Sequence, residues 1–366
     1  MYPLEDLGWC EYFSSQSEAS QTGSEFVPVR VAEDNREIYR IVSATGEFLS
    51  ELSGKFRHEI LGRADFPAVG DWVLASLRES EGRATIHRVL KRRSKFSRKI
   101  AGRKTEEQIV AANVDVIFLV SSLNREFNPR RIERYLTLAW ESGAKPVIVL
   151  NKCDLCENSD ELLRETESAA MGVRVILASA FRGDGIAEIR EILQPGFAKT
   201  EASAATAALL GSSGVGKSSL INAILGTPLL EINSIREGDD RGRHTTTTRQ
   251  LIVVPGGGVL IDTPGMRELQ LWDAGEGIGH AFGEIQELAA RCKFRDCKHE
   301  SEPGCAVRAA VQSEALDAER LESFHKLGRE EKFLEAKQNA AVRSQRTKEL
   351  RKMMKSVNQF YRDRGR

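Results

Sequence analysis

The stretch GSSGVGKS, residues 211–218, decides how the rest of this 366-residue sequence is interpreted. It fits the pattern G-x-x-x-x-G-K-[ST], in which glycines let the backbone curl until successive N–H groups point inward at phosphate groups. The apolar run AALL precedes it and SLINAIL follows it, which predicts a strand before the loop and a helix after it. A chance match in a surface loop would lack these flanking runs. The sequence therefore predicts a phosphate-binding loop, with Lys217 reaching the β- and γ-phosphates and Ser218 ligating Mg²⁺.

Three further motifs follow predicted strands, namely N-K-x-D at residues 151–154, S-A at 179–180 and D-x-x-G at 262–265. A carboxylate such as that of Asp154 accepts hydrogen bonds from both guanine donors, N1–H and N2–H₂, whereas adenine would leave it unpaired. Each motif alone also fits an ordinary turn, but four at strand tips favour a guanine-nucleotide site. The residues expected to contact the nucleotide are Asn151, Lys152, Asp154, Ser179, Ala180, Gly211, Ser212, Ser213, Gly214, Val215, Gly216, Lys217, Ser218, Ser219, Asp262 and Gly265.

The guanine motif also predicts individual roles. The stem of Lys152 lies over the base, Asn151 ties its loop to the phosphate loop, and the backbone at 179–180 supplies an N–H to guanine O6. Cys153 and Cys156 form a C-x-x-C pair, a pattern found in redox and zinc sites, but no second pair lies nearby in the sequence. We therefore expect both thiols to be bystanders.

The order of these motifs is rotated. Ordinary small GTPases run from phosphate loop through D-x-x-G to N-K-x-D and S-A, whereas here the guanine motifs come first. A site made of strand tips tolerates this order, because chain ends that lie close can be joined and the chain reopened elsewhere. Apolar runs alternating with helical segments predict an α/β fold with a mostly parallel sheet covered on both faces. One such helix is expected to start at Asn128 and Pro129 and to stop at Gly143.

The N-terminal region has a different texture. Five short apolar runs separated by turn residues span residues 26–93, a pattern typical of an OB-type β-barrel, although a β-sandwich or an irregular β-domain also fits. The Ser-rich start is expected to be a flexible tail. The expected domains are a tail over 1–25, an OB-fold domain over 26–104, a circularly permuted GTPase domain over 105–275, and a zinc-binding domain with a basic C-terminal helix over 276–366.

A cysteine and histidine cluster lies within that last part. Cys292-x₄-Cys297-x-His299-x₅-Cys305 supplies three thiolates and an imidazole in one short stretch, as structural zinc requires. The alternative is a set of free buried thiols. Four protein ligands leave no open position, so the sequence predicts one structural Zn²⁺ rather than a catalytic one.

Composition and charge limit the partners. Lys plus Arg and Asp plus Glu are both 53, and hydrophobic residues make up 41%, as in ordinary soluble globular proteins. No window has the roughly 18 consecutive apolar residues of a membrane span, and the N-terminus does not read as a signal peptide, so we expect a cytoplasmic protein. Basic runs at 91–104 and 340–366 fit contacts with RNA phosphates, with Phe96 stacking on a base, or else two solvated surfaces.

Together these features resemble the ribosome small-subunit-dependent GTPase family RsgA, the YjeQ/YloQ-type circularly permuted GTPases, from about residue 26 to the end. The resemblance implies a monomer that binds GTP, GDP, the small (30S) ribosomal subunit and its rRNA, and that hydrolyses GTP late in subunit assembly when the subunit stimulates it. Two alternatives stay open. One is a regulatory GTPase with a protein target and no RNA partner, and the other is a nucleotide-dependent RNA-binding module that does not hydrolyse GTP.

The resemblance also bears on catalysis. Residues 242–247 match the switch pattern of the family, so Thr247 is expected to complete the Mg²⁺ shell with Ser218 and Asp262. Met266 stands where many GTPases carry a water-orienting Gln, and a thioether cannot take that role. His244 is therefore the candidate that aligns the water, unless it is only an exposed loop imidazole, and turnover is expected to be slow without the partner.

Overall fold

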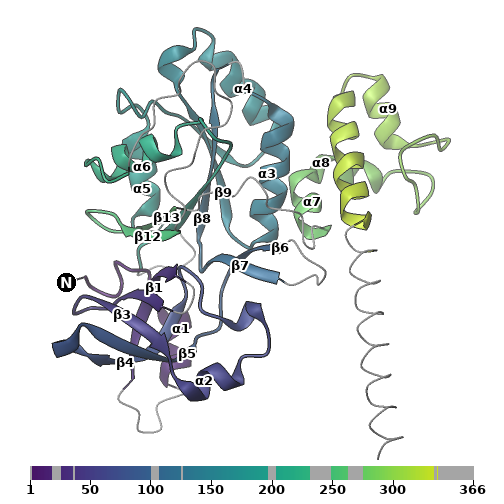
Figure 1. Cartoon of the computed structure of the whole chain (residues 1–366). Helices are drawn as coiled ribbons and strands as arrows, with labels where there is room; N and C mark the ends of the chain where they lie inside the picture. Colours follow the sequence, from purple (N-terminus) through teal and green to yellow (C-terminus); the bar gives the residue numbers. More distant parts are fainter. Residues whose placement is uncertain are drawn as a thin grey trace, which may run out of the picture.

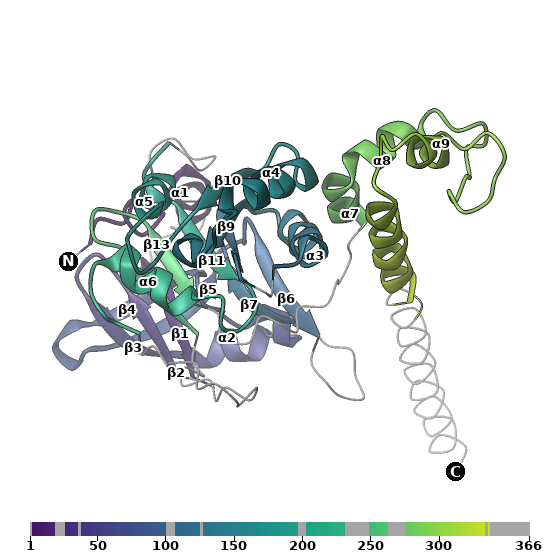
Figure 2. The same cartoon turned by 90° about the horizontal axis from the view of Figure 1, so that it is seen from above.

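The computed structural model describes residues 2–18, 26–35, 38–99, 107–124, 127–196, 203–230, 249–262, 275–333 and 336. These residues form three packed parts: a β-barrel, drawn purple to blue in Figure 1, a sheet flanked by helices, and a small helical part drawn green to yellow. The helical part lies beside helix α3, as the second view also shows (Figure 2). No helix in these ranges is both long enough and apolar enough to span a bilayer.

Five strands of the described chain close into the N-terminal barrel. They are β1 (Val27–Asn35), β2 (Ile38–Val42), β3 (Glu47–Leu52), β4 (Trp72–Arg78) and β5 (Arg83–Val89). The ring runs β1-β2-β3-β5-β4 and closes because β4 also pairs with β1. Alternate side chains point inward, as in β3, where Phe48 and Leu52 are buried between exposed neighbours. The barrel expected from the alternating runs is confirmed, and the sandwich is excluded.

The start of the chain does not form the expected flexible tail. Helix α1 (Glu11–Glu18) packs on the barrel, and Leu7 and Phe13 are almost fully buried. The ring of Trp9 lies 4.7 Å from that of Trp72, centre to centre. The expectation was wrong over residues 2–18 because widely spaced apolar side chains pack around Trp72 of the barrel, and no local periodicity predicts this.

The central sheet has the predicted α/β form. Its strands in the described residues are β8 (Val116–Ser122), β9 (Lys145–Asn151), β10 (Arg174–Leu177), β11 (Thr206–Leu210), β12 (Gln250–Val253) and β13 (Val259–Asp262). The order is β10-β9-β8-β11-β13-β12, with all neighbours parallel except the antiparallel pair β12 and β13. If the strands are renumbered from β11 as strand 1 and the count continues from β13 to β8, the order reads 6-5-4-1-3-2. The rotation therefore changes where the chain begins and leaves the spatial order of the strands intact.

Helices cover both faces of the sheet. One face packs against α3 (Pro129–Glu141) and α4 (Ser159–Ala169), and the other against α5 (Ile186–Leu193) and α6 (Lys217–Leu225). Strand β8 has apolar side chains on both faces, since Ile117 belongs to the first core and Phe118 to the second. A strand buried on both faces must be apolar throughout, which is why it is a continuous apolar run in the sequence.

The barrel joins the sheet through a buried arginine. The side chain of Arg30, 1% exposed, donates to the carbonyl oxygens of Leu7, Gly70 and Asn113 and lies over the ring of Trp72. Burial lowers the pKa of Arg30 to about 9, so it still carries its charge at neutral pH. One side chain thus ties the N-terminal segment, the barrel and the start of the sheet together. Strands β6 (Lys95–Lys99) and β7 (Glu107–Ala112) form a separate two-stranded sheet at this junction.

The helical part packs on the outer side of α3. It contains α7 (Gly275–Ala281), α8 (Gly283–Ala289), α9 (Ala306–Gln312) and a helical stretch over 318–333. Close approach of α7 to α3 requires Gly277, because a Cβ there would lie 2.4 Å from the carbonyl oxygen of Thr137. Its N–H donates to Glu141 Oε2 at 3.1 Å. The helical part is therefore fixed against the helix that follows β8.

Candidate functional site

The phosphate loop has the shape that its glycines predict. It connects β11 to α6, and Gly214 and Gly216 have φ values of +77° and +94°. A Cβ on Gly211 would lie 2.3 Å from the carbonyl oxygen of Val120, so the loop also needs glycine for close packing. Lys217 Nζ donates to the carbonyl oxygens of Gly211 (2.8 Å) and Ser212 (2.7 Å). The ammonium group is therefore held across the loop.

The N-K-x-D motif leaves the tip of β9 and meets this loop. Asn151 Nδ2 donates to the carbonyl oxygen of Val215 at 2.8 Å, and Lys152 Nζ donates to that of Gly214 at 2.7 Å. Asn151 Oδ1 accepts from the N–H of Ala180 at 3.2 Å. The structure thus brings together three tips that lie at residues 151, 180 and 215 of the sequence. The expected tie between the guanine motif and the phosphate loop is present.

Asp154 lies in the short turn that follows, half-buried beside the S-A segment. The N–H of Cys153 donates to the carbonyl oxygen of Ala178 at 3.1 Å, which fixes this turn against the tip of β10. Ser179 is fully buried, and its Oγ accepts from the N–H of Arg182 at 3.0 Å. The N–H of Ala180 bonds to Asn151 Oδ1, so a guanine O6 would share that donor or use a neighbouring one. The base contacts expected of these residues stay predictions.

The remaining predicted residues divide into described and undescribed ones. Asp262 is the last residue of β13, which pairs in parallel with β11, so it lies at the edge of the sheet where the phosphate loop begins. Its side chain is 7% exposed. Ser218 and Ser219 are half-buried in the first turn of α6. His244, Thr247, Gly265 and Met266 lie outside the described residues, and their roles stay predictions.

Sequence reasoning missed one side chain at this site. Arg131, in the first turn of α3, donates from Nη1 to Ser212 Oγ at 2.9 Å. The helix follows β8, and β8 is the neighbour of β11 that feeds the phosphate loop. The sequence does show a basic residue in the first turn of this helix. It points to the phosphate loop only when the order of the strands is known.

The C-x-x-C pair shows no sign of reactivity. Burial raises the pKa of the Cys153 thiol, whereas a reactive cysteine needs a lowered one. Cys156 Sγ lies 3.2 Å from Asn158 Oδ1. All six cysteines are free of disulfides. That Cys153 and Cys156 are bystanders stays a prediction.

The four residues of the C-terminal cluster come together as expected. The ligand atoms of Cys292, Cys297, His299 and Cys305 all lie within 4.8 Å of one another. The Sγ atoms of Cys292 and Cys305 are 3.9 Å apart, and His299 Nδ1 lies 3.6 and 3.4 Å from them. A tetrahedral zinc centre has S–S and S–N edges of about 3.8 and about 3.6 Å. Within the described ranges this is the one such metal-ligating cluster, and its geometry fits zinc.

A carboxylate holds the loop between two of these ligands. Glu302 accepts from the N–H groups of Lys298 (2.8 Å), Glu300 (3.0 Å) and Ser301 (3.0 Å). These backbone donors lower the pKa of Glu302 to about 2, so it is ionised at neutral pH. The loop that presents His299 is therefore partly ordered by the protein itself.

The basic run 91–104 is less exposed than its composition implied. Arg92 pairs with the fully buried Asp71 at 2.7 Å, and Arg93 pairs with Asp115. Phe96 is 3% exposed and belongs to the core, so the prediction that it stacks on a base is wrong. The side chains of the run that the structure shows as exposed are those of Lys91 and Lys95. Residues 100–106 and the basic segment 340–366 lie outside the described residues.

Comparison with known proteins gives one consistent result. A family model described as RsgA GTPase matches residues 89–272. A protein of Opitutus terrae named "Small ribosomal subunit biogenesis GTPase RsgA" is 45% identical over 341 residues, which cover 90% of this chain and 90% of that protein. "Small ribosomal subunit biogenesis GTPase RsgA 2" of Lactiplantibacillus plantarum is 45% identical and covers 91% of this chain and 92% of its own length.

Two solved structures share the fold. YjeQ from Thermotoga maritima superposes with a TM-score of 0.64 at 31% identity, covering 84% of this chain and 98% of that one. YloQ, described as a circularly permuted GTPase, gives a TM-score of 0.61 at 23% identity over 85% of this chain and 97% of that one. The description of YloQ as circularly permuted agrees with the rotated strand order found in this chain.

Proposed function

This chain belongs to the RsgA GTPase family and is a GTP hydrolase, and from that premise we propose that it acts in the biogenesis of the small ribosomal subunit. It binds the small (30S) subunit and its rRNA late in assembly, and the subunit stimulates its hydrolysis of GTP. The names of the relatives support the first statement. The distribution of exposed basic side chains supports the contact with RNA.

The observation that carries the nucleotide site is the Asn151 bridge, because it joins the base-recognition tip to the phosphate loop in one rigid unit. On this basis Asp154 accepts the guanine N1–H and N2–H₂ groups and Lys152 lies over the base. The N–H groups of residues 211–219 and the ammonium of Lys217 bind the phosphates.

Mg²⁺ would be held by Ser218, Asp262 and Thr247, and when bound it neutralises charge on the β- and γ-phosphates. His244 aligns the attacking water, because Met266 has no group that can orient it. Without the usual Gln, water positioning must come from elsewhere, so intrinsic turnover should be slow. This is the reason that we propose stimulation by the partner.

The cysteine and histidine cluster holds one structural Zn²⁺. The distances among Cys292, His299 and Cys305 match the edges of a tetrahedral centre, Cys297 lies within 4.8 Å of all three, and four protein ligands leave no position for a substrate. The ion would join the segment after α8 to the start of α9, where Cys305 Sγ also accepts from the N–H of Arg308 at 3.4 Å. Its role is to hold the helical part in one shape.

The RNA-facing surface lies on the barrel. Arg92 donates to the carbonyl oxygens of Ala64 (2.6 Å) and Phe66 (2.8 Å), so the basic run lies against the loop that follows helix α2 (Gly54–Glu59). Helix α2 presents the exposed basic side chains of Lys55 and Arg57, the loop that of Arg63, and the run those of Lys91 and Lys95. Such a group suits phosphate contacts, with affinity that falls as salt rises.

We also propose a monomeric cytoplasmic protein without a membrane partner, with an OB-fold domain over 26–104, a GTPase domain over 105–275 and a zinc-binding domain over 276–366. The junction of the first two domains lies outside the described residues. The junction of the last two falls at the start of α7, which packs on α3.

The direct test measures GTP hydrolysis against added small ribosomal subunits, with large subunits at the same concentration as the control. Turnover should rise and saturate with small subunits only, and co-sedimentation should weaken as salt is raised. A chain that hydrolyses GTP at one rate throughout and fails to sediment with small subunits at low salt would contradict the proposal. That result would favour the regulatory GTPase with a protein target.

A further inference from the structure

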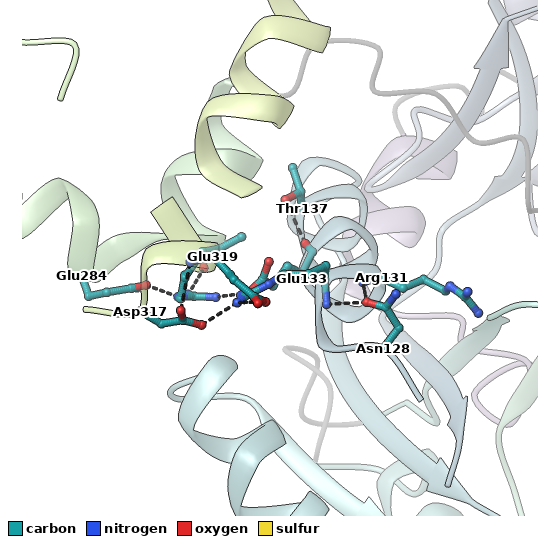
Figure 3. Close-up of polar contacts among 10 residues, drawn as sticks. Asn128, Arg131, Glu133, Thr137, Glu284, Asp317 and Glu319 are labelled. Atoms are coloured by element: carbon teal, nitrogen blue, oxygen red, sulfur yellow. Dashed lines mark hydrogen bonds and ion pairs between the residues drawn. The ribbon is translucent and has the colours of Figure 1, made fainter. Parts of the chain in front are cut away.

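Two adjacent arginines in the first turn of α3 reach in opposite directions. Arg131 Nη1 donates to Ser212 Oγ in the phosphate loop at 2.9 Å. Arg130 turns to the helical part, where it pairs with Asp317 and with Glu319 (3.1 Å). Figure 3 shows Arg131 extending away from the side of the helix on which Glu133, Asp317 and Glu319 gather. A single turn of helix therefore touches both the nucleotide loop and the zinc-binding part.

The turn that carries them is held firmly. Asn128 caps the helix, with Oδ1 accepting from the N–H groups of Arg130 (3.0 Å) and Arg131 (3.3 Å). Pro129 at the first helical position fixes φ for the start of the helix. Both arginines therefore start from one well-ordered turn of backbone.

The clamp on the zinc side centres on a buried carboxylate. Glu133, 1% exposed, accepts at Oε1 from Arg130 Nη1 (2.7 Å) and Arg320 Nη1 (2.9 Å), while its Oε2 is buried without a partner. Arg320 also pairs with Glu284, donates to the carbonyl oxygen of Ala281 at 2.9 Å, and lies 4.8 Å over the ring of Phe282. A buried charge that relies on two arginines holds their relative positions strictly.

Ser212, the residue of the phosphate loop that Arg131 contacts, also contacts Lys217. Ser212 accepts from Arg131 through its hydroxyl and from Lys217 Nζ through its carbonyl oxygen. Fixing Ser212 therefore fixes the direction of the carbonyl group that orients the lysine. An ammonium placed correctly for the phosphates contributes to the rate mainly through its position.

We propose that Arg131 is a positioning residue for GTP hydrolysis, which acts on Lys217 through Ser212, and that the clamp of Arg130, Glu133 and Arg320 makes this action depend on how the zinc-binding part is seated. The proposal rests on the GTPase activity and not on the ribosomal partner. It can therefore be tested in the full-length protein without subunits, so its failure leaves the ribosomal role untouched.

The test of the Arg131 contact is a double-mutant cycle on intrinsic GTP turnover. Arg131→Gln and Ser212→Ala should each lower kcat about threefold to tenfold, and the double variant should be no slower than the slower single one. Arg131→Lys, which keeps the charge and a donor, should restore part of kcat. Arg164→Gln, at an exposed arginine of α4, is the control and should be unchanged. Additive losses, or an unchanged kcat in Arg131→Gln, would overturn the proposal.

The link to the zinc-binding part has its own test, which spares the buried carboxylate. Asp317→Asn with Glu319→Gln removes partners of Arg130 that are 58% and 78% exposed, so the protein should still fold. Turnover should change at least about twofold in the wild-type background and stay constant when Arg131 is already Gln. Glu188→Gln breaks a comparably exposed ion pair with Arg174 and serves as the control. The same change in both backgrounds, or none in either, would refute the link.

Discussion

Asn151 joins loops that lie far apart in the sequence, and this single side chain sets the geometry of the base site. It is 1% exposed, so its amide has protein partners in place of water: the carbonyl oxygen of Val215 and the N–H of Ala180. Asp154 follows three residues later, in a turn fixed against the tip of β10. Its carboxylate is thus placed by the contacts that Asn151 and the turn make with the neighbouring strand tips.

The first prediction concerns the choice of base. Asp154→Asn should turn the preference from guanine toward xanthine nucleotides, because an amide N–H₂ can donate to the xanthine O2 that replaces the guanine amino group. Relative affinity for the two nucleotides should change by at least about a hundredfold in competition binding with a fluorescent nucleotide.

Glu157→Gln supplies the control, since this exposed carboxylate lies just beyond the motif and should leave the preference unchanged. If Asp154→Asn kept the wild-type order of guanine over xanthine, Asp154 would have no role in reading the base.

At the scale of elements, the site depends on loops that approach each other too closely for side chains. A Cβ on Gly216 would lie 2.3 Å from Asn151 Nδ2, at the point where the phosphate loop and the guanine motif touch. The same residue has a φ of +94° and precedes the first turn of α6. Glycine is required here for both reasons.

Gly216→Ala should therefore weaken GTP binding at least about tenfold, because it separates the two loops and strains the backbone. Gly172→Ala separates these effects, since Gly172 has a φ of +78° but open space around its Cβ position. The control should lose some thermal stability and keep its GTP affinity in calorimetry. Equal affinity losses in both variants would show that the contact between the loops is unimportant.

The zinc-binding element leads to a separate prediction. Cys305→Ser should abolish stoichiometric zinc, measured by elemental analysis, and expose the segment between α8 and α9 to proteolysis, because metal binding and local folding are coupled. Cys156→Ser removes a thiol outside the cluster and should retain one zinc per chain. A zinc-free Cys305→Ser protein with wild-type protease resistance would show that the fold does not need the metal.

At the scale of the whole molecule, the sequence predicts what local patterns encode. The barrel strands follow from alternation, the sheet from runs buried on both faces, and the site from motifs that each end a strand. The metal cluster follows from spacing within fourteen residues, 292–305. In these cases the residues that carry the signal are neighbours in the chain or lie on one element.

Other features depend on which distant segments meet, and local patterns do not encode that. Leu7 and Phe13 are buried because their segment packs against Arg30 and Trp72 of the barrel, so the expected tail is a packed segment. Phe96 belongs to the core although it lies between basic residues. Arg131 reaches Ser212 only because the strand order places α3 beside the phosphate loop. Each follows from the tertiary arrangement and not from a motif.

The central claim is that tips visited in rotated order form one guanine-nucleotide site, and amide hydrogen exchange of the full chain with and without GDP tests it most directly. GDP should slow exchange together in three segments, 151–156, 178–185 and 211–220, while an adenine nucleotide at the same concentration slows none of them. Protection confined to 211–220, with the other two segments exchanging as in the free protein, would contradict the claim.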